Sequence, residues 1–152
     1  MAKILVVDDE CDGKGVLERY LTSSGNTVTA ARTALGALAW LDREEFDVMV
    51  IDVSGRGQIR ALAVCRILKS DPRTMGTRVL FLSDVVDVES KAVAAGADAF
   101  LAKPYCFAEI DSQLYALINQ SKAGQPVMSG ISVHESIRAY SVGMLGWARS
   151  PI

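Results

Sequence analysis

The sequence predicts a doubly wound α/β domain with a five-stranded parallel sheet, followed by a short C-terminal helical tail. Five short apolar segments are separated by helical patterns, so strand and helix alternate five times along the chain. Most of these segments are nearly continuous runs of Val, Ile, Leu and Ala, which is typical of strands covered on both faces. Right-handed crossovers between parallel strands then place helices on both faces of the sheet.

The predicted strands are residues 3–7, 27–31, 48–51, 79–82 and 99–102. The second contains Thr27 and Thr29, and we therefore expect it at an edge of the sheet. Between the strands, apolar side chains at helical spacing predict the core-facing side of each helix. These side chains are Val16, Leu17, Tyr20 and Leu21; Leu35, Leu38, Trp40 and Leu41; Ala61, Val64, Cys65 and Leu68; a shorter set within 88–95, before Gly96; and Ile110, Leu114, Leu117 and Ile118.

Composition limits the classes of function. The chain has 152 residues, of which 50% are hydrophobic and 22% charged, so it can bury a core and is not largely disordered. A net charge of −2 argues against direct nucleic-acid binding. No apolar run approaches the ~20 residues that span a membrane, and the start of the chain is too short and too acidic for a signal peptide. Three cysteines without close spacing suit reduced thiols in a cytoplasm.

Reactive side chains follow four of the predicted strands. Asp8 and Asp9 follow the first, Asp52 the third, Ser83 the fourth and Lys103 the fifth. Ligand sites of doubly wound sheets lie beyond the carboxyl ends of the strands, so these groups are expected to converge. Clustered carboxylates repel one another unless a cation shares the site, and oxygen ligands suit Mg²⁺. A lysine and a hydroxyl beside them predict transfer of a phosphoryl group onto a carboxylate.

Each of these residues also has a simpler interpretation. Acids between a strand and a loop are common, Asp52 could cap the following segment, and Ser83 could be a turn residue. Lys103 could be an ordinary exposed lysine before a turn-forming proline. The combination at successive strand ends favours the phosphoryl-transfer site.

Four segments carry a family resemblance. They are residues 4–10 (ILVVDDE), 46–52 (FDVMVID), 79–83 (VLFLS) and 96–105 (GADAFLAKPY). On these motifs, residues 1–121 resemble the receiver domain of two-component response regulators, as in single-domain, chemotaxis-regulator-like members. The resemblance implies a flavodoxin-like sheet with strand order 2-1-3-4-5 and a cis Lys103–Pro104 bond.

The resemblance also implies roles for the site residues. Asp52 would accept the phosphoryl group, and Asp9, Asp52 and the backbone carbonyl of Ser54 would bind Mg²⁺. Asp8 would act mainly through a metal-bound water. Lys103 would contact the phosphoryl group, and in the switch Ser83 would move toward it while Phe100 swings inward.

The partners implied are a sensor histidine kinase or histidine phosphotransfer protein and a downstream protein target. The target would bind the face formed by the fourth helix, fifth strand and fifth helix. Such a protein is a cytoplasmic phosphoacceptor rather than an enzyme, with only self-phosphotransfer and self-dephosphorylation expected.

Two departures from the family pattern leave an alternative open. The segment after Asp52 lacks the usual Met-Pro pair and contains Gly55 and Arg56, and Asp84 replaces a small residue after Ser83. We interpret Arg56 and Asp84 as modulators of phosphorylation. The alternative is a degenerate receiver that binds proteins or dimerises independently of phosphorylation. A haloacid-dehalogenase-type phosphatase is disfavoured, because it needs an acid where Ser54 stands.

Residues 122–152 are predicted to form a linker and an amphipathic tail. Residues 123–126 (AGQP) are typical of a linker, and Ser132 with Glu135 matches a helix capping box. Apolar side chains then recur at spacings of four and three. They are Val133, Ile137, Tyr140, Met144 and Trp147. Three interpretations stay open: packing on the receiver, homodimer or partner binding, and disorder.

Overall fold

The computed structural model describes residues 1–9, 15–55, 57–85 and 87–123. Arg56 and the predicted interaction residues of the tail, from Val133 to Trp147, lie outside the described residues. Within them, strands and helices alternate five times, as the sequence predicts. The elements are β1 (Lys3–Asp8), α1 (Val16–Ser23), β2 (Thr27–Ala31), α2 (Ala34–Arg43), β3 (Val48–Asp52), α3 (Gly57–Ser70), β4 (Arg78–Ser83), α4 (Val88–Ala94), β5 (Ala99–Ala102) and α5 (Phe107–Ala123).

The sheet is fully parallel and has the order β2-β1-β3-β4-β5. The predicted strand order is therefore confirmed, and so is the position of β2 at an edge. The central strand β3 has four buried residues before Asp52, because β1 and β4 flank it and helices cover both of its faces. In the described part of the chain, none of the helices combines the length and the hydropathy that a membrane span requires.

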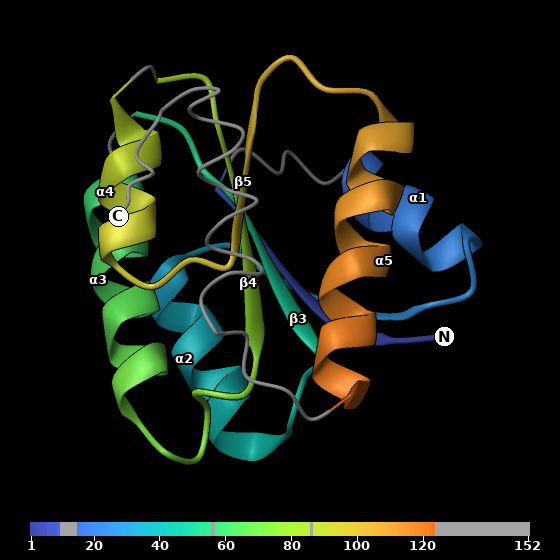
Figure 1. The fold of residues 1–152 in the computed structure, drawn as a ribbon, viewed down its shortest axis with the longest axis horizontal. Coiled ribbons are helices and arrows are strands. Elements are labelled where there is room, and N and C mark those ends of the chain that lie inside the picture. Colours follow the sequence, from blue (N-terminus) through green and yellow to red (C-terminus); the bar gives the residue numbers. More distant parts are fainter. Residues whose placement is uncertain (10–14, 56, 86, 124–152) are drawn as a thin grey trace.

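Two apolar cores lie on opposite faces of the sheet. Helices α1 and α5 cover one face, and α2, α3 and α4 cover the other (Figure 1). Strand β4 supplies both cores, since Leu80 and Leu82 face α1 and α5 while Val79 and Phe81 face the other helices. This alternation is expected because successive side chains of a strand point to opposite faces.

The predicted core face of α2 is wrong in part. Leu35 is 59% exposed, and the buried residues are Ala34, Ala37 and Leu41. Thr33 caps the helix by accepting the backbone N–H of Gly36 at 2.9 Å, so Ala34 is the first helical residue. The buried side then recurs at spacings of three and four from Ala34, and small side chains permit α2 to lie close to the sheet. In α1, Val16 is likewise exposed, whereas Leu17 and Leu21 are buried.

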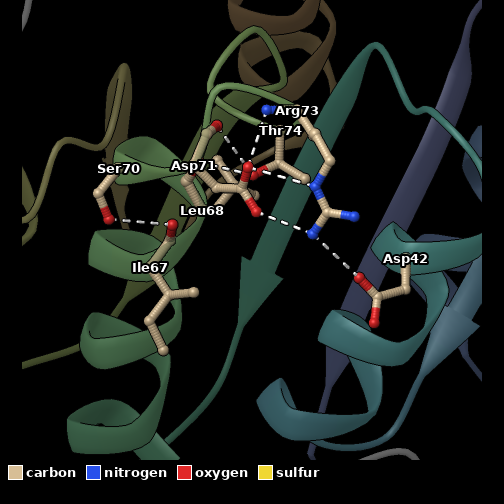
Figure 2. Close-up of polar contacts among 7 residues, drawn as sticks. All are labelled: Asp42, Ile67, Leu68, Ser70, Asp71, Arg73 and Thr74. Atoms are coloured by element: carbon tan, nitrogen blue, oxygen red, sulfur yellow. Dashed lines mark hydrogen bonds and ion pairs between the residues drawn. The ribbon is translucent and has the colours of Figure 1, made fainter.

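Polar contacts fix the connection from α3 to β4 (Figure 2). The carboxylate of Asp71 accepts the backbone N–H of Arg73 at 2.9 Å and pairs with its guanidinium at 3.0 Å. These bonds hold the pKa of Asp71 below its usual range. Arg73 also reaches Asp42 of α2 at 3.5 Å, and the Thr74 hydroxyl donates to the carbonyl of Leu68 at 2.7 Å. Side chains therefore shape a turn at the end of the molecule away from the strand carboxyl ends.

A buried ionic cluster joins α3, β4 and the segment before β5. Asp98, which is 7% exposed, pairs with Lys69 at 2.6 Å and with Arg78 at 3.6 Å. Its carboxylate also accepts the backbone N–H of Val79 at 2.8 Å, and Lys69 donates to the carbonyl of Thr77 at 2.8 Å. The charges of Asp98 and Lys69 are thus both paired and hydrogen-bonded, which offsets the cost of covering them.

We predict different effects for a buried and an exposed aspartate. Asp98→Ala should lower the free energy of unfolding by about 3 kcal/mol, because it removes a buried carboxylate and leaves the largely covered Lys69 side chain, which is 17% exposed, without its partner. Asp42→Ala removes a solvent-exposed ion pair and should leave the free energy of unfolding nearly unchanged. Urea denaturation followed by circular dichroism measures both. Equal losses for the two variants would contradict the assignment of the buried cluster.

Candidate functional site

The parallel register brings the predicted site residues to one edge of the sheet. Asp8, the last residue of β1, lies opposite Asp52, the last residue of β3. Ser83 ends β4 and lies opposite Ala102, which ends β5 and directly precedes Lys103. Each of β1, β3 and β4 runs one residue beyond its predicted end, so Asp8, Asp52 and Ser83 are held by the sheet itself.

Asp52 forms an ion pair with Lys103. The Nζ atom of Lys103 contacts the Oδ1 atom of Asp52, and the two side chains are 22% and 14% exposed. The backbone of Lys103 is fixed as well, because its N–H donates to the carbonyl of Ser83 at 2.9 Å. The Lys103–Pro104 peptide bond is cis, as the family resemblance implies. The positive charge of Lys103 therefore lies directly on the carboxylate that is expected to accept a phosphoryl group.

Asp9 is directed toward the loop after β3. Its Oδ1 and Oδ2 atoms accept the backbone N–H of Ser54 at 3.3 and 3.2 Å. Gly57 gives the Asp9 carboxylate room, since a Cβ atom on this glycine would lie 2.5 Å from Oδ2. The carbonyl of Ser54 accepts the N–H of Gly57 at 2.8 Å, and a carbonyl oxygen keeps a second lone pair for another partner.

The available donors fit Mg²⁺ better than a transition metal. Among the residues that the structure describes, no three His, Cys, Asp or Glu side chains form a group ready to hold a metal ion. Asp52 instead pairs with Lys103, and Asp9 accepts the Ser54 amide. Mg²⁺ needs only one or two carboxylates and keeps several waters, so the ligands that the family resemblance implies, the carboxylates of Asp9 and Asp52 and the Ser54 carbonyl, would be of the kind and number that it requires.

Ser83 is buried, and its hydroxyl oxygen accepts two hydrogen bonds. The Nε2 atom of Gln58 donates to Oγ at 2.8 Å, and the backbone N–H of Val85 donates to the same oxygen at 3.0 Å. Gln58 belongs to the site but was absent from the sequence prediction. The sequence contains one feature that could have identified it. Gln58 lies three residues before Ala61 and seven before Cys65, so it is a polar residue on the predicted buried side of α3.

The remaining predicted residues surround this centre. Phe100 is buried in the core that faces α2, α3 and α4, and it lies beside Phe81 in the sheet. Asp84 is exposed. Tyr105 was not singled out from the sequence. Burial, followed by the negative charges of Asp52 and Asp8, raises the pKa of its phenol to about 12.

The contact between Gly57 and Asp9 can be tested by adding one methyl group. Gly57→Ala should displace the Asp9 carboxylate, because the new Cβ would lie within 2.5 Å of it. The Ser54 amide proton should then exchange faster with solvent, as NMR hydrogen exchange would show. Gly76→Ala is the matched control, since no atom lies within 4 Å of a Cβ at that position. Unchanged Ser54 exchange in Gly57→Ala would show that Asp9 accommodates the methyl group.

The phenol of Tyr105 reports the charge on the site. Asp52→Asn should lower the pKa of Tyr105 toward 10 while leaving it raised, because burial is the larger cause. Folding raises this pKa, so the neutral phenol contributes to the free energy of unfolding. That contribution is fully present below pH ~10 and is lost as the pH rises through about 12. A ¹³C NMR titration of the tyrosine ring carbons measures the pKa. An unchanged pKa of Tyr105 in Asp52→Asn would show that the charge of Asp52 does not influence this phenol.

Comparisons with known proteins agree with the family resemblance. The sequence profile of the response regulator receiver domain matches residues 4–115. Response regulator MprA of Mycobacterium ulcerans (strain Agy99) is 33% identical over 120 residues, which are 79% of this chain and 51% of that protein. MprA of Mycobacterium tuberculosis (strain CDC 1551 / Oshkosh) is 32% identical over 120 residues, with 79% and 52% covered. The chain spans about half the length of these relatives.

Solved structures share the fold. Chemotaxis response regulator CheY4 of Vibrio cholerae gives a TM-score of 0.67 at 23% identity, covering 77% of this chain and 98% of that one. A second structure is the receiver domain of sensor histidine kinase PA1611 from Pseudomonas aeruginosa PAO1, which is described with a magnesium ion coordinated in its active site cleft. It gives a TM-score of 0.67 at 22% identity and covers 78% of this chain and 98% of that one. Since the family profile matches most of the chain and MprA exceeds 30% identity, this chain belongs to the response regulator receiver domain family.

Proposed function

We propose that Asp52 accepts a phosphoryl group from a phosphohistidine of a sensor histidine kinase or histidine phosphotransfer protein. The observation that carries the proposal is the position of Asp52, at the end of the central strand, opposite Asp8 and paired with Lys103. A carboxylate in this place can act as a nucleophile, and Lys103 already lies where negative charge develops during transfer.

The step is a displacement at phosphorus. A carboxylate oxygen of Asp52 forms a bond to phosphorus, and the bond to the donor's histidine nitrogen breaks, with the electron pair returning to that ring. Lys103 then exchanges part of its contact with Asp52 for a phosphoryl oxygen, and the Ser83 hydroxyl donates to another. Asp9, Asp52 and the Ser54 carbonyl would hold Mg²⁺, with Asp8 in support. When bound, the ion supplies charge neutralisation.

Support for Mg²⁺ comes from the oxygen-only donor set and from relatives of the same fold. The PA1611 receiver domain is described with magnesium in its active site cleft, and regulator TrrA of Thermotoga maritima with Mg²⁺ and BeF. The second structure has a TM-score of 0.65 at 23% identity and covers 77% of this chain and 99% of that one. Neither Asp84 nor Arg56 is a ligand in this proposal, and both act as modulators of phosphorylation.

Output is by phosphorylation-dependent protein binding. Phosphorylation adds about −1.5 to −2 charges and three acceptor oxygens at the ends of β3, β4 and β5, and it thereby favours a conformation that contacts them. The downstream protein would bind the face of α4, β5 and α5. The protein would act as a cytoplasmic signalling phosphoacceptor rather than an enzyme, without direct contact to nucleic acid.

Intact mass spectrometry after incubation with Mg²⁺ and acetyl phosphate tests the acceptor. The wild type should gain one phosphoryl group, while Asp52→Asn should gain none because the nucleophilic oxygen is lost. Asp42→Asn is the matched control on an exposed helix surface and should be labelled like the wild type. Removal of Mg²⁺ with EDTA should abolish labelling, because the repulsion between the site carboxylates and the phosphoryl donor is then uncompensated.

An unlabelled wild type, under conditions that label another receiver domain, would contradict the proposal. The degenerate receiver would then be the better description. Asp84→Ala distinguishes two causes of that result: restored labelling would assign the block to the extra carboxylate beside Ser83, and continued failure would assign it to the rest of the site.

A further inference from the structure

A buried glutamine contacts the hydroxyl group expected to switch. Gln58 is 6% exposed and Ser83 is 1% exposed, and the Nε2–Oγ distance between them is 2.8 Å. Among the buried residues of α3, Gln58 is the polar one, since the others are Ala61, Leu62, Val64, Cys65 and Leu68. A buried amide is costly unless it is hydrogen-bonded, so the bond to Ser83 explains how this side chain is tolerated.

The direction of this hydrogen bond has a consequence for Ser83. A serine hydroxyl has one O–H donor and two lone pairs. Gln58 and the backbone N–H of Val85 donate to the two lone pairs, so any further hydrogen bond of this oxygen uses its own proton. Phosphoryl oxygens only accept hydrogen bonds, and they therefore need a hydroxyl whose proton is directed toward them. The two donors hold Ser83 in that state.

Gln58 is also tied to the other side of the site. It is the second residue of α3, and the N–H of the preceding Gly57 donates to the carbonyl of Ser54 at 2.8 Å. The N–H of Ser54 in turn donates to Asp9. The first turn of α3 is therefore hydrogen-bonded to two parts of the site. Gly57 contacts Ser54, which is bonded to Asp9, and Gln58 contacts the Ser83 hydroxyl.

We propose that Gln58 is a positioning residue that orients the Ser83 hydroxyl as a donor to the phosphoryl group on Asp52. The inference rests on the proposed function and deepens it. Gln58 itself does not touch the phosphoryl group. It acts through Ser83, because its amide occupies one acceptor site of the oxygen and leaves the proton for the phosphoryl oxygens.

A double-mutant cycle tests this role. Gln58→Met keeps the length of the side chain and removes the donor, and it should slow the initial rate of acetyl phosphate labelling about fivefold, the equivalent of one ordinary hydrogen bond. In a Ser83→Ala background the same change should have no further effect, since the oxygen that Gln58 orients is gone. Gln120→Met, toward the far end of α5, is the matched control and should leave the rate unchanged.

A second readout does not depend on phosphorylation. In the unlabelled protein, Gln58→Met should shift the NMR signal of the Val85 amide, which donates to the same oxygen, and this shift should vanish in Ser83→Ala. Gln58→Glu provides a second variant of nearly the same size. Its carboxylate accepts the Ser83 proton, so labelling should be slower than in Gln58→Met. Thermal unfolding verifies that both variants fold.

The outcomes separate the two hypotheses. Equal slowing by Gln58→Met in the wild-type protein and in the Ser83→Ala variant would overturn the inference, because it would show a packing role only. A labelling rate equal to that of the wild type would also overturn it, while leaving Asp52 as the acceptor. A wild type that takes up no phosphoryl group would refute the proposed function and the inference together.

Discussion

The parallel pairing of β1, β3 and β4 is the constraint on which the site depends. Backbone hydrogen bonds between these strands fix where each one ends, and this places the last residues Asp8 and Asp52 opposite one another. Two neighbouring carboxylates repel each other, and the sheet holds them there only because its apolar cores stabilise the arrangement from both faces. Stability from buried Val, Ile, Leu and Phe thus offsets an unfavourable local charge distribution, which Lys103 partly neutralises.

Much of this could be predicted from the sequence because buried parallel strands have a strong pattern. Nearly continuous apolar runs located four of the five strands, a run with two threonines located β2, and the reactive residues after four of the strands marked one edge of the sheet. The convergence of Asp52 and Lys103, which are 51 positions apart in the sequence (103 − 52), followed from topology alone. The end of a helix could also be predicted from the sequence. Gly96, which was expected to follow the fourth helix, has a positive φ just after α4.

Other features could not be predicted because they depend on distances between layers. Which side of α2 is buried depends on how closely the helix approaches the sheet. The side that faces the sheet carries Ala34 and Ala37, while Leu35 is exposed. The partner of Gln58 is a hydroxyl on another element, and no local pattern specifies such a pairing. The role of Gly57 is similar, since it provides space for a carboxylate that is remote in the sequence. Periodicity predicts that a residue is buried, but not which polar group it meets.

Helix α3 touches the site at one end and the buried ionic cluster at the other. Gln58 in its first turn bonds to Ser83, the last residue of β4, while Lys69 in its last turn bonds to Thr77, just before β4 begins. With 14 residues, the helix is about 21 Å long. It is therefore hydrogen-bonded at both ends of β4, and a shift of the strand along its own axis would have to break one of these two contacts as well as its pairing with β3 and β5.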